Sequence, residues 1–371
     1  MVNDEQSQPL NIFDEIQGGS YTETISKIMD MSQGNEVLKD LLLLGFYQNP
    51  KREIHHKINS THNKVINAGR KFNWQCEHDG CNKPSAYCHE LSERAALSSL
   101  ADDEGKVVIL KRNLKNNSLE FIFDKIHVRD VLNFSGYCSE HDQSLFKSLD
   151  QPSGDVDLEY VNLQALRMMR RHKLSYQVLI KVARDMDSEI QSLISELLKE
   201  GLDISELQEG LETIHEIIGC NEELLSSACE FYDKLWAGIQ AKNYLVDFAE
   251  FPCYKLGWAF SQTYDLVSQE NGVRVFSFVF KMDLNGQPLL IHAWEKAAHI
   301  YECEGFDITP EKIIECLFLS KEKLVFSLDF LSDIRPEYLD YFLYDEQLYN
   351  NVKNPILLFL FKKIFFNVLE E

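Results

Sequence analysis

The stretch VRVFSFVFKMDLNGQPLLI, residues 273–291, decides the fold class of the C-terminal part of the chain. It contains two apolar runs on either side of Asn285-Gly286, and this dipeptide between apolar runs is the strongest short signal for a β-hairpin. The surrounding residues, 246–303, have the same strand-like texture. We therefore predict an antiparallel sheet here.

Helices are predicted both before and after this sheet in the sequence. Between residues 158 and 245, apolar residues recur every three to four positions, and Gly201, Gly219 and Asn221 are candidate helix ends. Beyond the sheet, Thr309-Pro310 is typical of a helix start, because Thr caps a helix and Pro suits its first turn. The rest of the C-terminal part is also expected to be helical.

Residues 74–150 have a different texture. The short apolar runs 107–110 and 119–123 flank the polar turn 115–118, which predicts a second hairpin. The sequence thus predicts an α+β protein in four parts. They are an N-terminal helical arm (1–73), a small module (74–150), a helical region (151–245) and an α+β domain with an antiparallel sheet and C-terminal helices (246–371).

Pairs of metal-ligating residues lie at both ends of the small module. Four residues separate Cys76 from Cys81, and two separate Cys138 from His141. Two close pairs separated by a hairpin are the layout of a treble-clef zinc site, with one pair on a knuckle and the other on the first turn of a helix. We predict a structural Zn²⁺ bound by these four side chains.

Glycines and rival ligands lie close to these pairs. Gly80 directly precedes Cys81, and Gly136 lies two residues before Cys138. A tight turn is expected at both glycines. Cys88, His78 and His89 are alternative ligands within the same segment.

By the spacing of these residues, the segment 74–147 resembles the His-Asn-His (HNH, ββα-metal) nucleases. His89 lies eight residues after Cys81, and Asn133 lies five residues before Cys138, the positions of the catalytic His and of the Asn in zinc-bearing members. The chain departs from the family at three points. Its second zinc pair is Cys-His, Asp142 replaces the last His, and the gap from His89 to Asn133 is longer.

The resemblance implies a metal-dependent endonuclease that hydrolyses phosphodiesters. His89 would be the general base that activates water, Asn133 would orient the loop or His89, and Asp142 would bind a catalytic Mg²⁺ or Mn²⁺. Each residue also has a structural interpretation. His89 could be a zinc ligand or pack in a turn, Asn133 could be a turn or capping residue, and Asp142 could be an acid favoured at a helix N-terminus.

Charge is distributed unevenly along the chain. The 371 residues include 37 Lys and Arg against 59 Asp and Glu, a net charge of −22, which argues against a protein coated in basic surface. Residues 51–150, however, hold 15 basic and 14 acidic residues, a net charge of +1, so the remainder carries −23. A nucleic acid could therefore approach only this segment.

Basic residues cluster on a helix predicted before residue 73 and on the hairpin predicted from runs 107–110 and 119–123. The candidates for nucleic-acid contact are Lys51, Arg52, Lys64, Arg70, Lys71, Lys111 and Arg112. A solvated helix face and a lysine-guarded strand edge are the alternative interpretation. A third run, residues 167–173, either packs against the acidic remainder or extends the basic surface.

The leading hypothesis is a zinc-binding, nucleic-acid-binding protein with metal-dependent nuclease activity, by analogy a bacterial genome-defence component. Its partner would be DNA or RNA on residues 51–150. The alternative is a non-catalytic interaction protein with a purely structural zinc and a protein partner on the acidic remainder. A third hypothesis, a hydrolase site in the sheet predicted at residues 246–303, has only His292 and Glu295 to support it.

A cytoplasmic location is expected. The N-terminal residues lack the basic start and apolar core of a secretory signal. The most apolar stretch, residues 355–366, is 12 residues long and is interrupted by two lysines, whereas a membrane span needs ~20. No membrane partner is expected.

Overall fold

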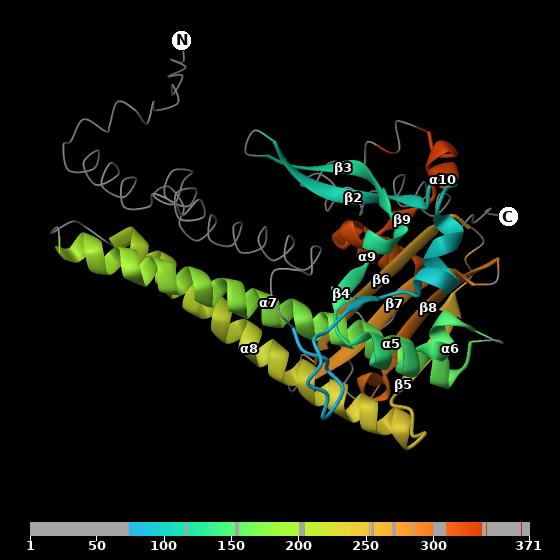
Figure 1. Cartoon of the computed structure of the whole chain (residues 1–371), viewed down its shortest axis with the longest axis horizontal. Coiled ribbons are helices and arrows are strands. Elements are labelled where there is room, and N and C mark those ends of the chain that lie inside the picture. The colour runs from blue at the N-terminus through green and yellow to red at the C-terminus, as the bar shows by residue number, and fades with distance from the viewer. Residues whose placement is uncertain are drawn as a thin grey trace, which may run out of the picture. The chain divides into compact units, whose positions relative to one another are not determined.

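Figure 1 shows a computed structural model of the chain. It describes residues 74–115, 118–152, 156–199, 205–251, 253, 256–268, 272–284, 286–299, 309–335, 339 and 365. Contacts divide the chain into one unit of Met1–Lys64 and Tyr176–Leu224 and a second unit of Val65–Ser175 and Leu225–Glu371. The sheets and the candidate site belong to the second unit. The N-terminal helices expected before residue 73 lie outside the described residues.

The second unit contains a seven-stranded antiparallel sheet with strand order β3-β2-β9-β6-β7-β8-β5 (Figure 1). Its strands are β2 (Lys106–Lys115), β3 (Ser118–His127), β5 (Val246–Phe251), β6 (Trp258–Val267), β7 (Arg274–Leu284), β8 (Gln287–Glu295) and β9 (Val325–Phe326). The hairpin predicted around Asn285-Gly286 is β7–β8, in which Leu284 pairs with Gln287. The α+β class and the antiparallel sheet are confirmed.

The hairpin β2–β3 belongs to the same sheet as the C-terminal strands. The two-residue strand β9 links them, because Phe326 pairs with Val108 of β2 on one side and with Trp258 of β6 on the other. Segments placed in separate parts by the sequence analysis therefore share one sheet. The four-part division at residues 73, 150 and 245 stays a prediction about folding units.

The predicted helical region forms two long helices. Helices of the described chain are α5 (Ser139–Leu145), α6 (Lys147–Asp150), α7 (Leu158–Lys199), α8 (Ser205–Gln240), α9 (Pro310–Leu319) and α10 (Leu328–Ser332). Gly219 and Asn221 do not end a helix, because both lie inside α8, where the Asn221 side chain donates to the carbonyl of Ile217 at 2.7 Å. The prediction at Thr309 is confirmed, since its hydroxyl accepts from the amide of Lys312 at the start of α9.

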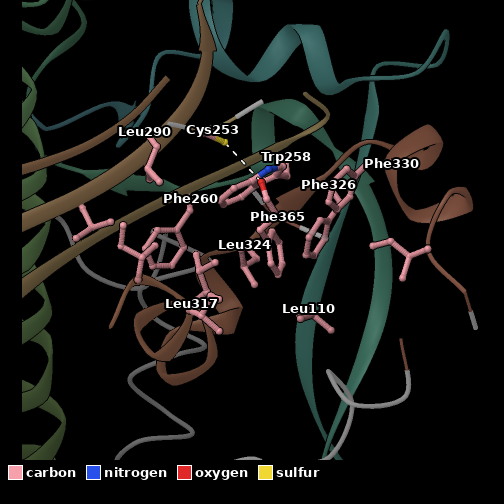
Figure 2. Packing of buried hydrophobic residues seen from close by; sticks show 14 of the residues in the cluster. Leu110, Cys253, Trp258, Phe260, Leu290, Leu317, Leu324, Phe326, Phe330 and Phe365 are labelled. Atoms are coloured by element: carbon pink, nitrogen blue, oxygen red, sulfur yellow. Dashed lines mark hydrogen bonds between the residues drawn. The ribbon is translucent and has the colours of Figure 1, made fainter. Parts of the chain in front are cut away.

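The main core lies between the sheet and the C-terminal elements (Figure 2). The indole of Trp258 meets the Phe365 ring edge-on at 4.8 Å between centroids, and the rings of Phe326 and Phe330 stack at 5.8 Å. The Cys253 thiol donates to the carbonyl of Phe365 at 3.7 Å (Figure 2). Burying each large apolar side chain contributes about 1.5–3 kcal/mol to folding. This cluster therefore stabilises the packing of β9 and α10 against β6.

A smaller substructure is formed by the segments on either side of the β2–β3 hairpin. Strand β1 (Tyr87–His89) pairs antiparallel with β4 (Asn133–Ser135), and α5 follows β4 directly. Between the two strands the chain forms η1 (Glu93–Leu97), η2 (Ser98–Leu100), the β2–β3 hairpin and η3 (Val128–Asp130). Two strands and a helix thus bring the residues at both ends of the small module together.

Candidate metal centre

The first ligand pair lies on a tight turn. The amide of Cys76 donates to the carbonyl of Lys83 at 3.0 Å, and the amide of Cys81 donates to the carbonyl of His78 at 3.0 Å. Gly80 adopts φ +73°, a left-handed conformation that glycine takes without steric cost. A chain bent in this way can direct both thiols to one side.

The second pair lies at the N-terminus of α5. Cys138 is the N-cap residue, and its carbonyl accepts the amide of Asp142 at 2.9 Å, which starts the helix. The backbone amide of His141 donates to the Cys138 sulfur and lowers the pKa of that thiol. A helix N-terminus favours the thiolate, the form that binds a metal.

The four predicted ligands converge on one point. Their ligand atoms all lie within 4.8 Å of one another. The Nδ1 atom of His141 is 3.3 Å from the sulfur of Cys76 and 3.3 Å from that of Cys138, and the sulfurs of Cys81 and Cys138 are 3.9 Å apart.

These separations fit a tetrahedral zinc ion. Zn–S bonds of about 2.3 Å and Zn–N bonds of about 2.0–2.1 Å place tetrahedral sulfurs about 3.8 Å apart and about 3.6 Å from the nitrogen. Burial raises the pKa of the Cys76 thiol to about 11, so a metal that binds the thiolate would displace a tightly held proton. Three thiols and an imidazole make a donor set suited to Zn²⁺.

None of the three rival ligands joins this group. Cys88 is fully buried, and its sulfur contacts the carbonyls of Ala86 and Tyr137, each at 3.6 Å. The ring of His78 stacks on the ring of His141 at 3.8 Å between centroids. His89 lies 3.7 Å from the Glu93 carboxylate.

The residues assigned to catalysis lie in the same β1–β4–α5 substructure. His89 and Asn133 are opposite each other in the strand register. The Asn133 amide donates to the carbonyl of Arg129 at 3.1 Å, and the Asp142 carboxylate lies 3.5 Å from the Arg167 guanidinium. Nε2 of His89 and Oδ1 of Asp142 have no hydrogen-bond partner among the described residues.

Burial governs the protonation of this pair. The side chains of His89 and Asp142 are only 15% and 19% exposed. Burial lowers the pKa of His89 and raises the pKa of Asp142, although the Arg167 charge opposes the latter shift. His89 is thus kept neutral, as a general base requires, but a cation already faces the carboxylate proposed to bind Mg²⁺.

The structure describes little of the expected nucleic-acid surface. Lys51, Arg52, Lys64, Arg70 and Lys71 lie outside the described residues, and Arg112 is described only as a residue of β2. The Lys111 side chain is 61% exposed and forms an ion pair with Asp124 at 3.0 Å. This surface stays a prediction.

The third basic run packs inward instead of extending a basic surface. Four of its cations, at most 7% exposed, reach carboxylates of the small module. The pairs are Arg167 with Asp142 and Asp150, Arg170 and Lys173 with Glu77, and Arg171 with Glu90. The two interpretations of this run were packing against the acidic remainder and a wider basic surface, but the carboxylates that these four cations meet belong to the small module. The signal was available, because these cations alternate along α7 with apolar residues such as Leu166 and Met169 and so share a helix with a buried face.

The geometry does not support a hydrolase site at His292 and Glu295 of the seven-stranded sheet. His292 is buried and bonds Ser277 at 2.8 Å, and burial lowers its pKa to about 3. The Ser277 hydroxyl is itself buried, and burial raises the pKa of Glu295. These groups are part of the packed sheet.

Fold and site together define an α+β protein with a candidate Cys₃His metal centre. Comparisons of the chain with protein-family models, with curated proteins and with solved structures found no match. No helix in the described part of the chain is long and apolar enough to cross a membrane.

Proposed function

We propose that the chain is a zinc-binding protein in which Cys76, Cys81, Cys138 and His141 hold a structural Zn²⁺. The observation that supports this function is the convergence of three sulfurs and one imidazole nitrogen within 4.8 Å. Four protein ligands fill a tetrahedron and leave no position for substrate or water, which is the mark of a structural site. The metal would join the knuckle to the N-terminus of α5.

Metal analysis with a matched pair of variants tests this proposal. We expect one zinc per chain in the purified protein, and loss of that zinc in Cys138→Ser. Cys220→Ser is the control, because Cys220 is exposed and lies outside the cluster. Cobalt replacement should give the intense sulfur-to-metal absorption of a thiolate site in the control alone. Zinc retained equally in both variants would refute the ligand assignment.

A metal-dependent endonuclease in the same module is the second candidate, and it gives the module a nucleic-acid substrate. The pairing of His89 with Asn133 beside the helix that carries Asp142 favours it. His89 would take a proton from the attacking water, and Asn133 would hold the strand end that carries His89. A Mg²⁺ or Mn²⁺ at Asp142 would supply charge stabilisation at the phosphate. The Arg167 contact makes this candidate the weaker one.

Plasmid cleavage tests the nuclease candidate. Purified protein is incubated with supercoiled plasmid and Mg²⁺ or Mn²⁺, and His89→Ala is compared with His215→Ala, whose side chain is 57% exposed on α8. The candidate requires cleavage by wild type and by the His215 variant, and none by the His89 variant. No cleavage by any protein, or equal cleavage by all, would exclude His89 as the base.

Nucleic-acid binding through residues 51–150 is proposed separately from cleavage, as is a role in bacterial genome defence. The net charge of +1 in this segment supports binding. A labelled DNA or RNA duplex should bind the zinc-loaded protein with an affinity that falls as salt rises. Reversing Lys51 and Arg52 to Glu should weaken binding by about tenfold. Unchanged binding would leave the structural-zinc interaction protein as the remaining hypothesis.

A further inference from the structure

A cavity of about 310 Å³ lies beside the candidate zinc site. One wall is the knuckle segment Glu77, His78 and Asp79, and the opposite wall is formed by Tyr232, Asp233 and Trp236 of α8. Both walls belong to the same compact unit. The cavity thus depends on the loop between two proposed zinc ligands, so its shape rests on the proposed structural zinc.

The charge lining this cavity is of one sign. Three carboxylates and no lysine or arginine line it. Glu77 is already neutralised, since Arg170 and Lys173 pair with it at 3.1 and 2.5 Å. Asp79 and Asp233 are exposed and form no ion pair among the described residues. Two uncompensated carboxylates therefore face one small space.

Aromatic rings complete the lining. The half-buried indole of Trp236 meets the His78 ring edge-on at 6.0 Å between centroids. The buried ammonium of Lys173 does not line the cavity, but it lies 4.0 Å from the centre of the Tyr232 ring while it pairs with Glu77, and both of these residues do line it. The molecule thus already binds one of its own cations here with a carboxylate and an aromatic face. Trp236 beside Asp79 and Asp233 offers the same combination to a second cation.

We propose that this cavity binds a lysine or arginine side chain of a basic segment of a protein partner. The carboxylates would pair with the charged end, and the indole of Trp236 would cover it. A nucleic-acid phosphate would be repelled by the same groups. A second cavity of about 500 Å³ shares Leu145 and Trp236 with the first, which gives room for the residues that flank the inserted side chain.

Peptide binding tests the proposal. A labelled peptide rich in Lys and Arg is titrated with the full zinc-loaded chain, and fluorescence anisotropy measures its binding. We expect the double variant Asp79→Asn/Asp233→Asn to bind about tenfold more weakly than wild type. Trp236→Leu should show a similar loss. Asp103→Asn/Asp185→Asn is the control, because it removes the same charge from exposed residues that do not line the cavity and should bind as wild type does.

Three outcomes would overturn the proposal. Equal binding by wild type and both double variants would mean that the peptide responds only to the net charge of the chain. Absence of binding to a wild-type protein with full zinc content would exclude the site while leaving the proposed zinc function intact. Displacement of the peptide by equimolar spermidine would assign the cavity to a free polyamine instead of a protein side chain. Zinc content is measured in every sample, so a protein without zinc counts against the zinc proposal itself.

Discussion

Glu90 is the residue whose loss should cost the most outside the metal centre. Its carboxylate is buried between the guanidinium of Arg171 and the ammonium of Lys323, which lies 3.0 Å away. Glu90→Gln would leave the buried Arg171 and the half-buried Lys323 without their counter-charge, so we expect the free energy of unfolding to fall by about 3 kcal/mol. Urea denaturation measures the change.

An exposed pair provides the comparison for Glu90. Glu104 and Lys106 pair at 2.7 Å in solvent, and such exposed pairs contribute little to stability. Glu104→Gln should therefore leave the urea midpoint nearly unchanged. If Glu90→Gln and Glu104→Gln lowered the free energy of unfolding equally, the buried ion pairs of Glu90 would contribute no more than an exposed pair.

The same carboxylate gives a pH dependence. Burial by itself would raise the pKa of Glu90, but Arg171 and Lys323 outweigh it and hold the pKa below the usual value. A lowered pKa in the folded state gives stability that is fully present above the ordinary Glu pKa of about 4.3 and is lost as the pH falls through the folded value. We expect the stability gap between wild type and Glu90→Gln to shrink between pH 5 and pH 3, as urea titrations at each pH would measure. A gap that grows on acidification would contradict this sign.

For single residues, the proposed zinc ligands could be predicted from the sequence, but the ion pairs around them could not. Close Cys and His pairs are visible because ligands on one turn must be near in sequence. The partners of Glu90 and Glu77 are distant, since Lys323 is 233 residues from Glu90 and Lys173 is 96 residues from Glu77. Only the assembled fold decides which buried charges meet. The reason for Gly136 was not predictable either. A tight turn was expected there, but an added Cβ would lie 2.5 Å from the Phe134 ring, so the close approach of this ring requires glycine.

Gly257 decides how β6 meets α10 at the scale of elements. It adopts φ +89°, and an added Cβ would lie 2.8 Å from both the Cβ of Phe330 and the hydroxyl of Ser327. Gly272 has a similar φ of +68° with nothing within 4 Å of an added Cβ. Both alanine variants incur the left-handed backbone penalty of about 1–2 kcal/mol, but only Gly257→Ala also forces the chain apart.

Thermal and urea unfolding of the two glycine variants separate these terms. Gly257→Ala should be less stable than Gly272→Ala by a further ~1–3 kcal/mol, the usual cost of overpacking. Equal losses would mean that α10 can shift away from β6 without cost, and the packing of Phe326 and Phe330 would then need another explanation.

Elements with local signals were predictable, and those fixed by distant partners were not. Both hairpins and the start of α9 carry their own turn and cap residues. Strand β9 has two residues and no pattern of its own, yet it joins β2 to β6. Gly219 lies inside α8 although glycine is unfavourable in helices, because the cost of about 1 kcal/mol is small for a helix of 36 residues.

For the whole molecule, the near-neutral charge of residues 51–150 has a structural consequence. Acids of this segment, including Glu77, Glu90 and Asp150, are paired with buried cations of α7 that lie outside it. Part of its acidity is therefore internal and does not face a ligand. Lys111, the candidate for nucleic-acid contact whose side chain is described, takes no part in these pairs and is 61% exposed.

Metal removal should destabilise more than the small module. Glu77, between the proposed ligands Cys76 and Cys81, pairs with α7, and Glu90, which follows β1, pairs with both α7 and Lys323 near β9. Loss of the knuckle would release charges buried against both elements. We therefore expect a chelator to lower the midpoint of thermal unfolding by at least about 5 °C, while the transition stays single.

Differential scanning calorimetry with and without chelator measures this coupling, and Cys138→Ser provides the control because it should show no further shift on chelation. Two separate transitions, with only the smaller one sensitive to chelator, would mean that the zinc module folds independently of the sheet. The single transition is expected because Glu77 and Glu90 join the small module to α7 and to Lys323, which precedes β9 of the seven-stranded sheet. Zinc would then act on the sheet through buried charge, without any ligand in it.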